Sequence, residues 1–91
     1  MTKADLIEKV AQNAAIIKKD AAAAVNAVFD VIIDTLVKGE KLTILGFGTF
    51  ETRERAARMG RNPATGEKLK IPAAIVPAFK PSKVLKEKVN E

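Results

Sequence analysis

The four arginines of this chain lie within nine residues of one another. They are Arg53, Arg55, Arg58 and Arg61, and no acidic residue occurs between Arg55 and Gly66. A guanidinium group is planar and presents several N–H donors, so it recognises a phosphate group through two parallel hydrogen bonds. The residue type and the spacing therefore favour binding to a phosphate backbone, although a run of charges is also typical of a solvated surface.

A proline follows the last arginine. Pro63 stands in a segment whose composition predicts a turn, Asn62-Pro63-Ala64-Thr65-Gly66, and turn formation alone can explain it. Proline is also compact, apolar and rigid, and it has no N–H that would be left unsatisfied between two bases. Proteins that bind the minor groove insert such wedges and kink the duplex, and flanking arginines would lie along the groove, where negative potential is concentrated.

The composition excludes several other kinds of chemistry. The chain has no Cys, His, Trp or Tyr, which argues against disulfides, the usual zinc sites and histidine acid–base catalysis. Ser82 is the only serine and has no histidine partner. Asp30 and Asp34 share a helix face, but a solvated strip is favoured there over an active site. We therefore expect no enzyme, no cofactor and no small-molecule substrate.

The charge is unevenly distributed along the 91 residues. The net charge is +5, and all of the excess lies after Phe50, since the first fifty residues carry six lysines and six acidic groups. No apolar run is long enough to span a membrane, and no signal peptide is evident. We expect a cytoplasmic protein of one small domain, and small domains often gain stability by forming oligomers.

Helices are expected in the first 39 residues. Thr2 and Asp5 form a capping-box pattern before a first apolar stripe. A second helix is expected from near Asp20, with Lys18 to Asp20 supplying its start, to a stop at Gly39. Its apolar residues cover more than one face, which indicates burial on several sides. A sheet alone could cover this surface, but we favour a sheet together with a second copy of the chain.

From Lys41 the hydrophobic period changes to that of strands. Leu42 and Ile44 alternate with polar residues, 46–48 is a tight reversal in which two glycines can supply positive φ, and 49–55 alternates again. The strand-like pattern on both sides of the turn at 62–66 predicts a long hairpin over residues 53–76. Ser82 is a suitable N-cap for a last helix.

These motifs resemble those of the bacterial histone-like HU family, which includes IHF. The resemblance runs from Lys3 to Asn90, and it is most specific in Gly46-Phe47-Gly48-Thr49-Phe50-Glu51, Gly60-Arg61-Asn62-Pro63, Thr65-Gly66 and Val76-Pro77-Ala78-Phe79-Lys80-Pro81. It implies an α+β fold in which an intertwined homodimer has a helical base (1–39), a sheet or saddle (40–55 and 72–81), a β-ribbon arm (53–76) and a C-terminal helix (82–91).

The resemblance also implies roles for particular residues. Contacts of the arm with DNA would be made by Arg53, Arg55, Arg58, Arg61, Asn62 and the intercalating Pro63. Contacts of the saddle and flank with phosphates would be made by Lys3, Lys80, Ser82, Lys83 and Lys86. The dimer core is expected to contain Val28, Phe29, Ile32, Leu36, Leu42, Ile44, Phe47, Phe50 and Phe79.

Four positions depart from the usual family pattern. Met59 and Ala64 stand near the tip where polar or basic residues are common, Ile75 stands where Lys or Arg is frequent, and Ala74 stands where a small polar residue is common. Each change removes a potential phosphate contact.

The favoured function is architectural and largely independent of sequence: bending and compaction of double-stranded DNA in the nucleoid, with a preference for bent, nicked or otherwise distorted duplexes. An IHF-like subunit that prefers particular sites and pairs with a different chain is the alternative. RNA binding is less favoured because the four phenylalanines are expected in the core. Membrane binding is less favoured because the chain lacks a basic amphipathic helix.

Overall fold

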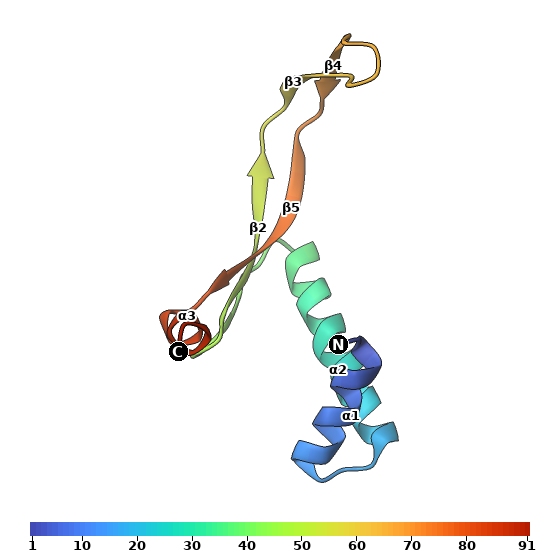
Figure 1. The fold of residues 1–91 in the computed structure, drawn as a ribbon, viewed down its shortest axis with the longest axis vertical. Helices are drawn as coiled ribbons and strands as arrows, with labels where there is room; N and C mark the ends of the chain where they lie inside the picture. Colours follow the sequence, from blue (N-terminus) through green and yellow to red (C-terminus); the bar gives the residue numbers. More distant parts are fainter. The chain divides into compact units, whose positions relative to one another are not determined.

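The computed structural model describes all residues from 1 to 91, with three helices and five strands (Figure 1). The chain divides into two compact units, Met1–Asp34 and Thr35–Glu91, which are described separately below. The first unit contains α1 (Lys3–Ala14) and most of α2 (Lys18–Val37). The second contains β1 (Leu42–Ile44), β2 (Gly48–Arg55), β3 (Arg58–Arg61), β4 (Lys68–Ile71), β5 (Ala74–Pro81) and α3 (Lys83–Val89). The α+β fold class is confirmed.

Helix α1 begins at the predicted capping box. The Thr2 backbone N–H and hydroxyl both donate to the Asp5 carboxylate, at 2.9 and 3.1 Å, and the Asp5 N–H donates to the Thr2 hydroxyl. These hydrogen bonds hold the pKa of Asp5 below its ordinary value of 3.8, because they stabilise the ionised form. The helix ends at Ala14, and the C-cap residue Ala15 adopts the left-handed conformation with φ of 55°.

Helix α2 starts at Lys18, within the segment from Lys18 to Asp20 that was expected to supply its start. Its most buried residues are Ala21 and Val25, which are 0% and 7% exposed, and Val25 lines a hollow together with Leu6 and Val10 of α1. Large apolar side chains further along α2 stay exposed, including Val28 at 54% and Phe29 at 39%. Most of the apolar surface of this helix is therefore left without cover in the single chain.

Strands β1, β2 and β5 form an antiparallel sheet with β2 in the middle. Leu42, Phe50 and Phe79 lie side by side across it, because Phe50 pairs with each of the other two residues. The ring centroids of Phe50 and Phe79 are 4.9 Å apart, and the Phe47 ring lies 5.2 Å from that of Phe79. One face of the sheet is thus apolar, with an aromatic cluster at its centre.

The two glycines around Phe47 have different roles. Gly46 has a φ of 78°, as the turn requires. Gly48 has no positive φ, but a Cβ there would lie 2.6 Å from the carbonyl oxygen of Lys80 and 2.7 Å from the Phe79 ring. The expectation that both glycines serve turn geometry is therefore corrected, since Gly48 is required for the close approach of β5.

The arm is a ribbon with one interruption. Strands β2 and β5 pair as far as Arg55 with Ala74, and pairing resumes between Arg58 and Ile71. Two residues on each side, 56–57 and 72–73, lie outside the strands. The pairing register is the same before and after the break because the two sides skip equal numbers of residues. The sheet segment expected to start at residue 72 starts at Ala74, after a proline that has no N–H for the ladder.

Candidate nucleic-acid interface

The cations of the sheet gather on the face opposite the phenylalanines. Paired residues of an antiparallel sheet share a face, and successive residues alternate between faces. Lys80 pairs with Thr49, Arg53 with Val76, and Arg55 with Ala74, so the three cations project from one side. We call this side the basic face; it also carries Thr43, Thr49 and Glu51. The fold thereby separates the phosphate-binding candidates from the core candidates.

One carboxylate lies among these cations. Glu51 is 3.8 Å from Arg53 and 4.0 Å from Lys41, and its side chain is only 16% exposed. Arg53 remains 59% exposed, so it can reach a ligand in spite of this partner. Glu51 is thus the carboxylate that neutralises part of the positive charge of this face.

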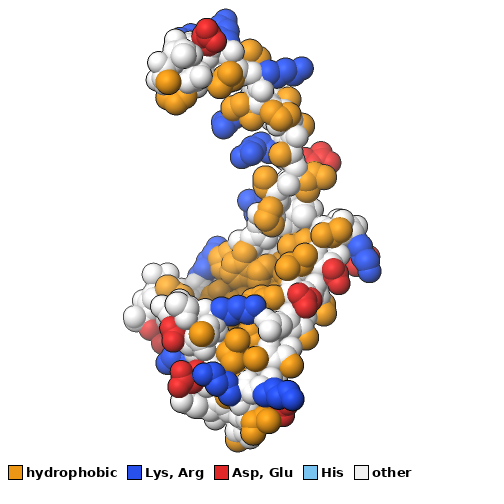
Figure 2. Space-filling view, turned by 90° about the vertical axis from the view of Figure 1, so that its right-hand side faces the viewer, with side chains coloured by type: hydrophobic (Ala, Val, Ile, Leu, Met, Phe, Trp, Pro, Cys, Tyr) orange, Lys and Arg blue, Asp and Glu red, His pale blue; other side chains and the backbone are white.

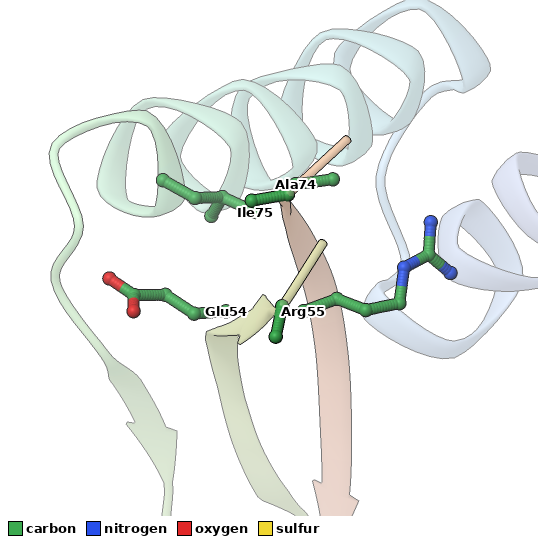
Figure 3. Close-up of a pocket in the computed structure, with 6 residues that line it drawn as sticks. Glu54, Arg55, Ala74 and Ile75 are labelled. Carbon is green, nitrogen blue, oxygen red and sulfur yellow. The ribbon is translucent and has the colours of Figure 1, made fainter. Parts of the chain in front are cut away.

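Arg55 and Glu54 mark the end of the continuous ribbon. Their side chains point to opposite sides of the strand, and Ile75 lies on the side of Glu54 (Figure 3). A hollow at the break is lined by Glu54, Arg55, Ala56, Ala73, Ala74 and Ile75. Ile75 is 71% exposed and shares the face of Glu54 rather than the basic face.

Beyond the break, the ribbon separates Arg58 from Arg61. Arg61 pairs with Lys68, and Met59 pairs with Lys70, so three cations share one face of the outer ribbon. Arg58 pairs with Ile71 and lies on the other face. Lys68 and Lys70 were not among the predicted contacts. Their alternation with Leu69 was visible in the sequence, but only the register places them beside Arg61.

The tip loop is closed by hydrogen bonds that involve Asn62. Its N–H donates to the carbonyl of Glu67 at 2.8 Å, and its carbonyl accepts from the N–H of Gly66 at 2.7 Å. Its side-chain Oδ1 accepts from the N–H of Ala64 at 2.9 Å. Pro63 is exposed at the end of the loop. In Figure 2 this outer part of the ribbon carries Lys and Arg side chains interspersed with hydrophobic ones.

The flank candidates lie around the start of α3. The Ser82 hydroxyl accepts from the N–H of Leu85 at 3.1 Å and so caps the helix, as predicted. Its own hydrogen can still be donated to a phosphate. Lys80, Lys83 and Lys86 are exposed, and Lys83 lies 4.0 Å from Glu87.

The remaining flank candidate, Lys3, lies in the first unit. Its Nζ is 5.9 Å from the centroid of the Phe29 ring, within the range of a cation–π interaction. Because the phenyl ring of Phe29 carries no net charge, the Lys3 ammonium group keeps its full positive charge.

The predicted dimer-core residues are incompletely covered in the single chain. Val28, Phe29, Ile44, Phe47 and Phe79 are all more than a third exposed. Ile32, Leu36, Leu42 and Phe50 are half-buried.

Neither a metal centre nor a membrane span is found. No group of three or more acidic side chains is placed to hold a metal ion. No helix has the length and apolar character needed to cross a bilayer.

The α+β fold with its β-ribbon arm (Figure 1), together with the family model that it matches, defines a non-enzymatic DNA-binding protein. The chain belongs to the bacterial DNA-binding protein family of HU, whose family model, described as "Bacterial DNA-binding protein", matches residues 1–90. It is 58% identical over 90 residues to the DNA-binding protein HU of Geobacillus stearothermophilus, covering 99% of this chain and 100% of that protein. It is 56% identical over 89 residues to DNA-binding protein HU 1 of Bacillus subtilis, covering 98% of this chain and 97% of that protein.

Solved structures give the same assignment. The HU chain in an Anabaena HU–DNA cocrystal structure is 49% identical to this chain in sequence. The two structures superpose with a TM-score of 0.94, covering 98% of this chain and 97% of that chain. HU from Thermotoga maritima is 36% identical, with a TM-score of 0.69, covering 98% of both chains. The resemblance inferred from the sequence is confirmed.

Proposed function

We propose that this protein is an architectural component of the bacterial nucleoid that bends and compacts double-stranded DNA without reading its sequence. The observation that carries the proposal is that cations share one face of each part of the ribbon, Arg53 and Arg55 before the break and Arg61, Lys68 and Lys70 after it, and that Pro63 is exposed at the tip. Contacts with phosphates supply affinity but carry no sequence information. The chain is similar to an HU that has been crystallised with DNA.

In this proposal the arm lies in the minor groove and Pro63 enters a base step. Lys80, Arg53 and Arg55 follow the backbone near the body, and Arg61, Lys68 and Lys70 follow it near the tip. Arg58, on the other face, reaches a phosphate on the far side of the ribbon. Insertion of an apolar wedge into the minor groove is the mode for which HU and IHF are reference cases.

The active unit in this proposal is a homodimer. The apolar side chains of α2 that stay exposed, such as Val28 and Phe29, would be buried by a second copy and by the apolar face of the sheets. Two arms would then reach around one duplex. Measurement of the mass of the purified chain in solution tests this directly. A monomer that dimerises only with a different chain would favour the IHF-like alternative.

A preference for distorted DNA follows from the energy of kinking. Unstacking a base step costs a few kcal/mol, and DNA that is already nicked or bent avoids part of it. We expect about ten- to a hundredfold tighter binding to nicked than to intact duplexes, because 1.4 kcal/mol corresponds to a factor of ten. Equal affinities for the two duplexes would contradict the architectural role.

The proline wedge is tested with the Pro63→Ala variant. We expect a smaller bend angle, measured by fluorescence energy transfer between the ends of a labelled duplex. We expect the salt dependence of binding to stay the same, because no charge is removed. An unchanged bend angle in this variant would refute the wedge.

A further inference from the structure

The tip loop holds Pro63 between hydrogen bonds made by one residue. The backbone groups of Asn62 close the loop through Glu67 and Gly66. Its side-chain Oδ1 reaches past Pro63 to accept the N–H of Ala64 at 2.9 Å. Asn62 is half-buried, whereas Pro63 is exposed. The side chain of Asn62 is therefore committed to the loop that presents the proline.

Together with the bond from the Gly66 N–H to the Asn62 carbonyl, this hydrogen bond restrains the one backbone torsion of Pro63 that its ring does not set. The pyrrolidine ring already sets φ, and the residue before a proline is restricted to extended conformations. Only ψ of Pro63 remains, and ψ decides where the N–H of Ala64 points. Because that N–H is bonded to Oδ1 of Asn62, the orientation of the proline ring relative to the ribbon is set before DNA arrives.

The same bond removes an obstacle to insertion. A backbone N–H that loses water without gaining a partner is costly to bury. Pro63 has no N–H, and the N–H of Ala64 is already satisfied within the loop. Neither Pro63 nor the peptide N–H that follows it therefore brings an unpaired donor into the stack of bases.

We propose that Asn62 is a positioning residue for the Pro63 wedge, not a residue that reads bases. This inference rests on the wedge proposed above and assigns Asn62 a role that acts through Pro63. Thr65 provides a contrast: its hydroxyl accepts from the N–H of Glu67 at 3.3 Å, on the returning side of the loop, away from the peptide that follows Pro63.

The test compares Asn62→Ala, Asn62→Ser and the control Thr65→Val on one end-labelled duplex. The readouts are the ratio of bent to straight complexes, from single-molecule energy transfer, and the salt dependence of affinity. Asn62→Ala should lower the ratio about two- to tenfold, the range expected for loss of one hydrogen bond. Asn62→Ser should restore most of the ratio of bent to straight complexes. A serine hydroxyl can form the same kind of turn, although more weakly, so the recovery should not be complete. Thr65→Val should have less effect than Asn62→Ala, and the salt slope should not change in any variant.

A double-variant cycle separates positioning from direct contact. In a Pro63→Ala background, Asn62→Ala should have no further effect on the ratio or on affinity. A further loss of affinity there would show that Asn62 contacts DNA itself and would overturn the inference, as would an unchanged ratio for Asn62→Ala alone. If instead Pro63→Ala leaves the bend intact, the wedge fails, and with it the role assigned to Asn62.

Discussion

Glu51 provides the sharpest test of the basic face, because it is the carboxylate that lies among the cations. It is 3.8 Å from Arg53 and 4.0 Å from Lys41. If this face contacts DNA, the carboxylate repels phosphates and competes for Arg53. We predict that Glu51→Gln strengthens DNA binding and steepens its dependence on salt.

The magnitude follows from the geometry. The Arg53 side of the ion pair is exposed to solvent, whereas Glu51 is largely covered. Taking the value for surface ion pairs, about 1 kcal/mol, release of Arg53 should raise affinity by about fivefold per chain. One additional phosphate contact per chain steepens the slope of log affinity against log salt by about 0.9. Because of this steeper slope, the affinity advantage of Glu51→Gln over the unmodified protein should grow about threefold per chain when the salt is lowered from 200 to 50 mM.

The matched control is Glu54→Gln. It makes the same change of charge three residues further along β2, but the Glu54 side chain points to the opposite side of the ribbon from Arg55 (Figure 3). The assay is a fluorescence anisotropy titration of each variant with the same duplex at several salt concentrations, after circular dichroism has shown that both variants fold. Equal gains in the two variants would indicate net charge alone. Weaker binding by Glu51→Gln would show that Glu51 orients Arg53 for binding, and would refute the competition.

Three further predictions concern the outer arm, the sheet and the first helix. Lys70→Ala should flatten the salt slope by about 0.9 per chain, and an unchanged slope would remove Lys70 from the interface. Gly48→Ala should destabilise the fold by about 1–3 kcal/mol, because the added Cβ meets backbone and ring atoms. Gly60→Ala should cost under about 1 kcal/mol, since its Cβ meets only the movable end of a side chain; similar thermal shifts for the two variants would contradict this reasoning. The lowered pKa of Asp5 stabilises the folded state above pH 3.8, and this contribution is lost as pH falls through the lowered pKa. Asp5→Asn should therefore show a shallower loss of stability in acid, and an equal acid dependence would exclude the contribution.

Some features could be predicted because they depend on residues close together in the chain. The capping box at Thr2, the cap at Ser82 and the stop at Gly39, with φ of 76°, are local hydrogen bonds and local backbone geometry. The turn at 62–66 is likewise formed by hydrogen bonds between residues close together in the chain. The change of hydrophobic period near Lys41 likewise separated the helical part from the sheet.

Other features depended on pairing between distant segments. The exposure of Val28 and Phe29 on α2 could not be predicted from hydrophobic periodicity alone, because it depends on which elements cover the helix. The role of Gly48 could not be read locally, because the atoms that crowd it belong to β5. Lys68 and Lys70 were overlooked because their neighbours across the ribbon are set by register.

The sequence by itself determined the kind of protein: the arginines and the proline tip point to phosphate binding, and these are properties of composition and spacing. Only the tertiary structure decided which cations share a face. It placed Lys80, Arg53 and Arg55 on one face and turned Arg58 away from Arg61. The physical reason is that a shift of one residue in strand pairing would exchange the two faces of a strand relative to its partner, and that pairing is established by packing and hydrogen bonds across the sheet.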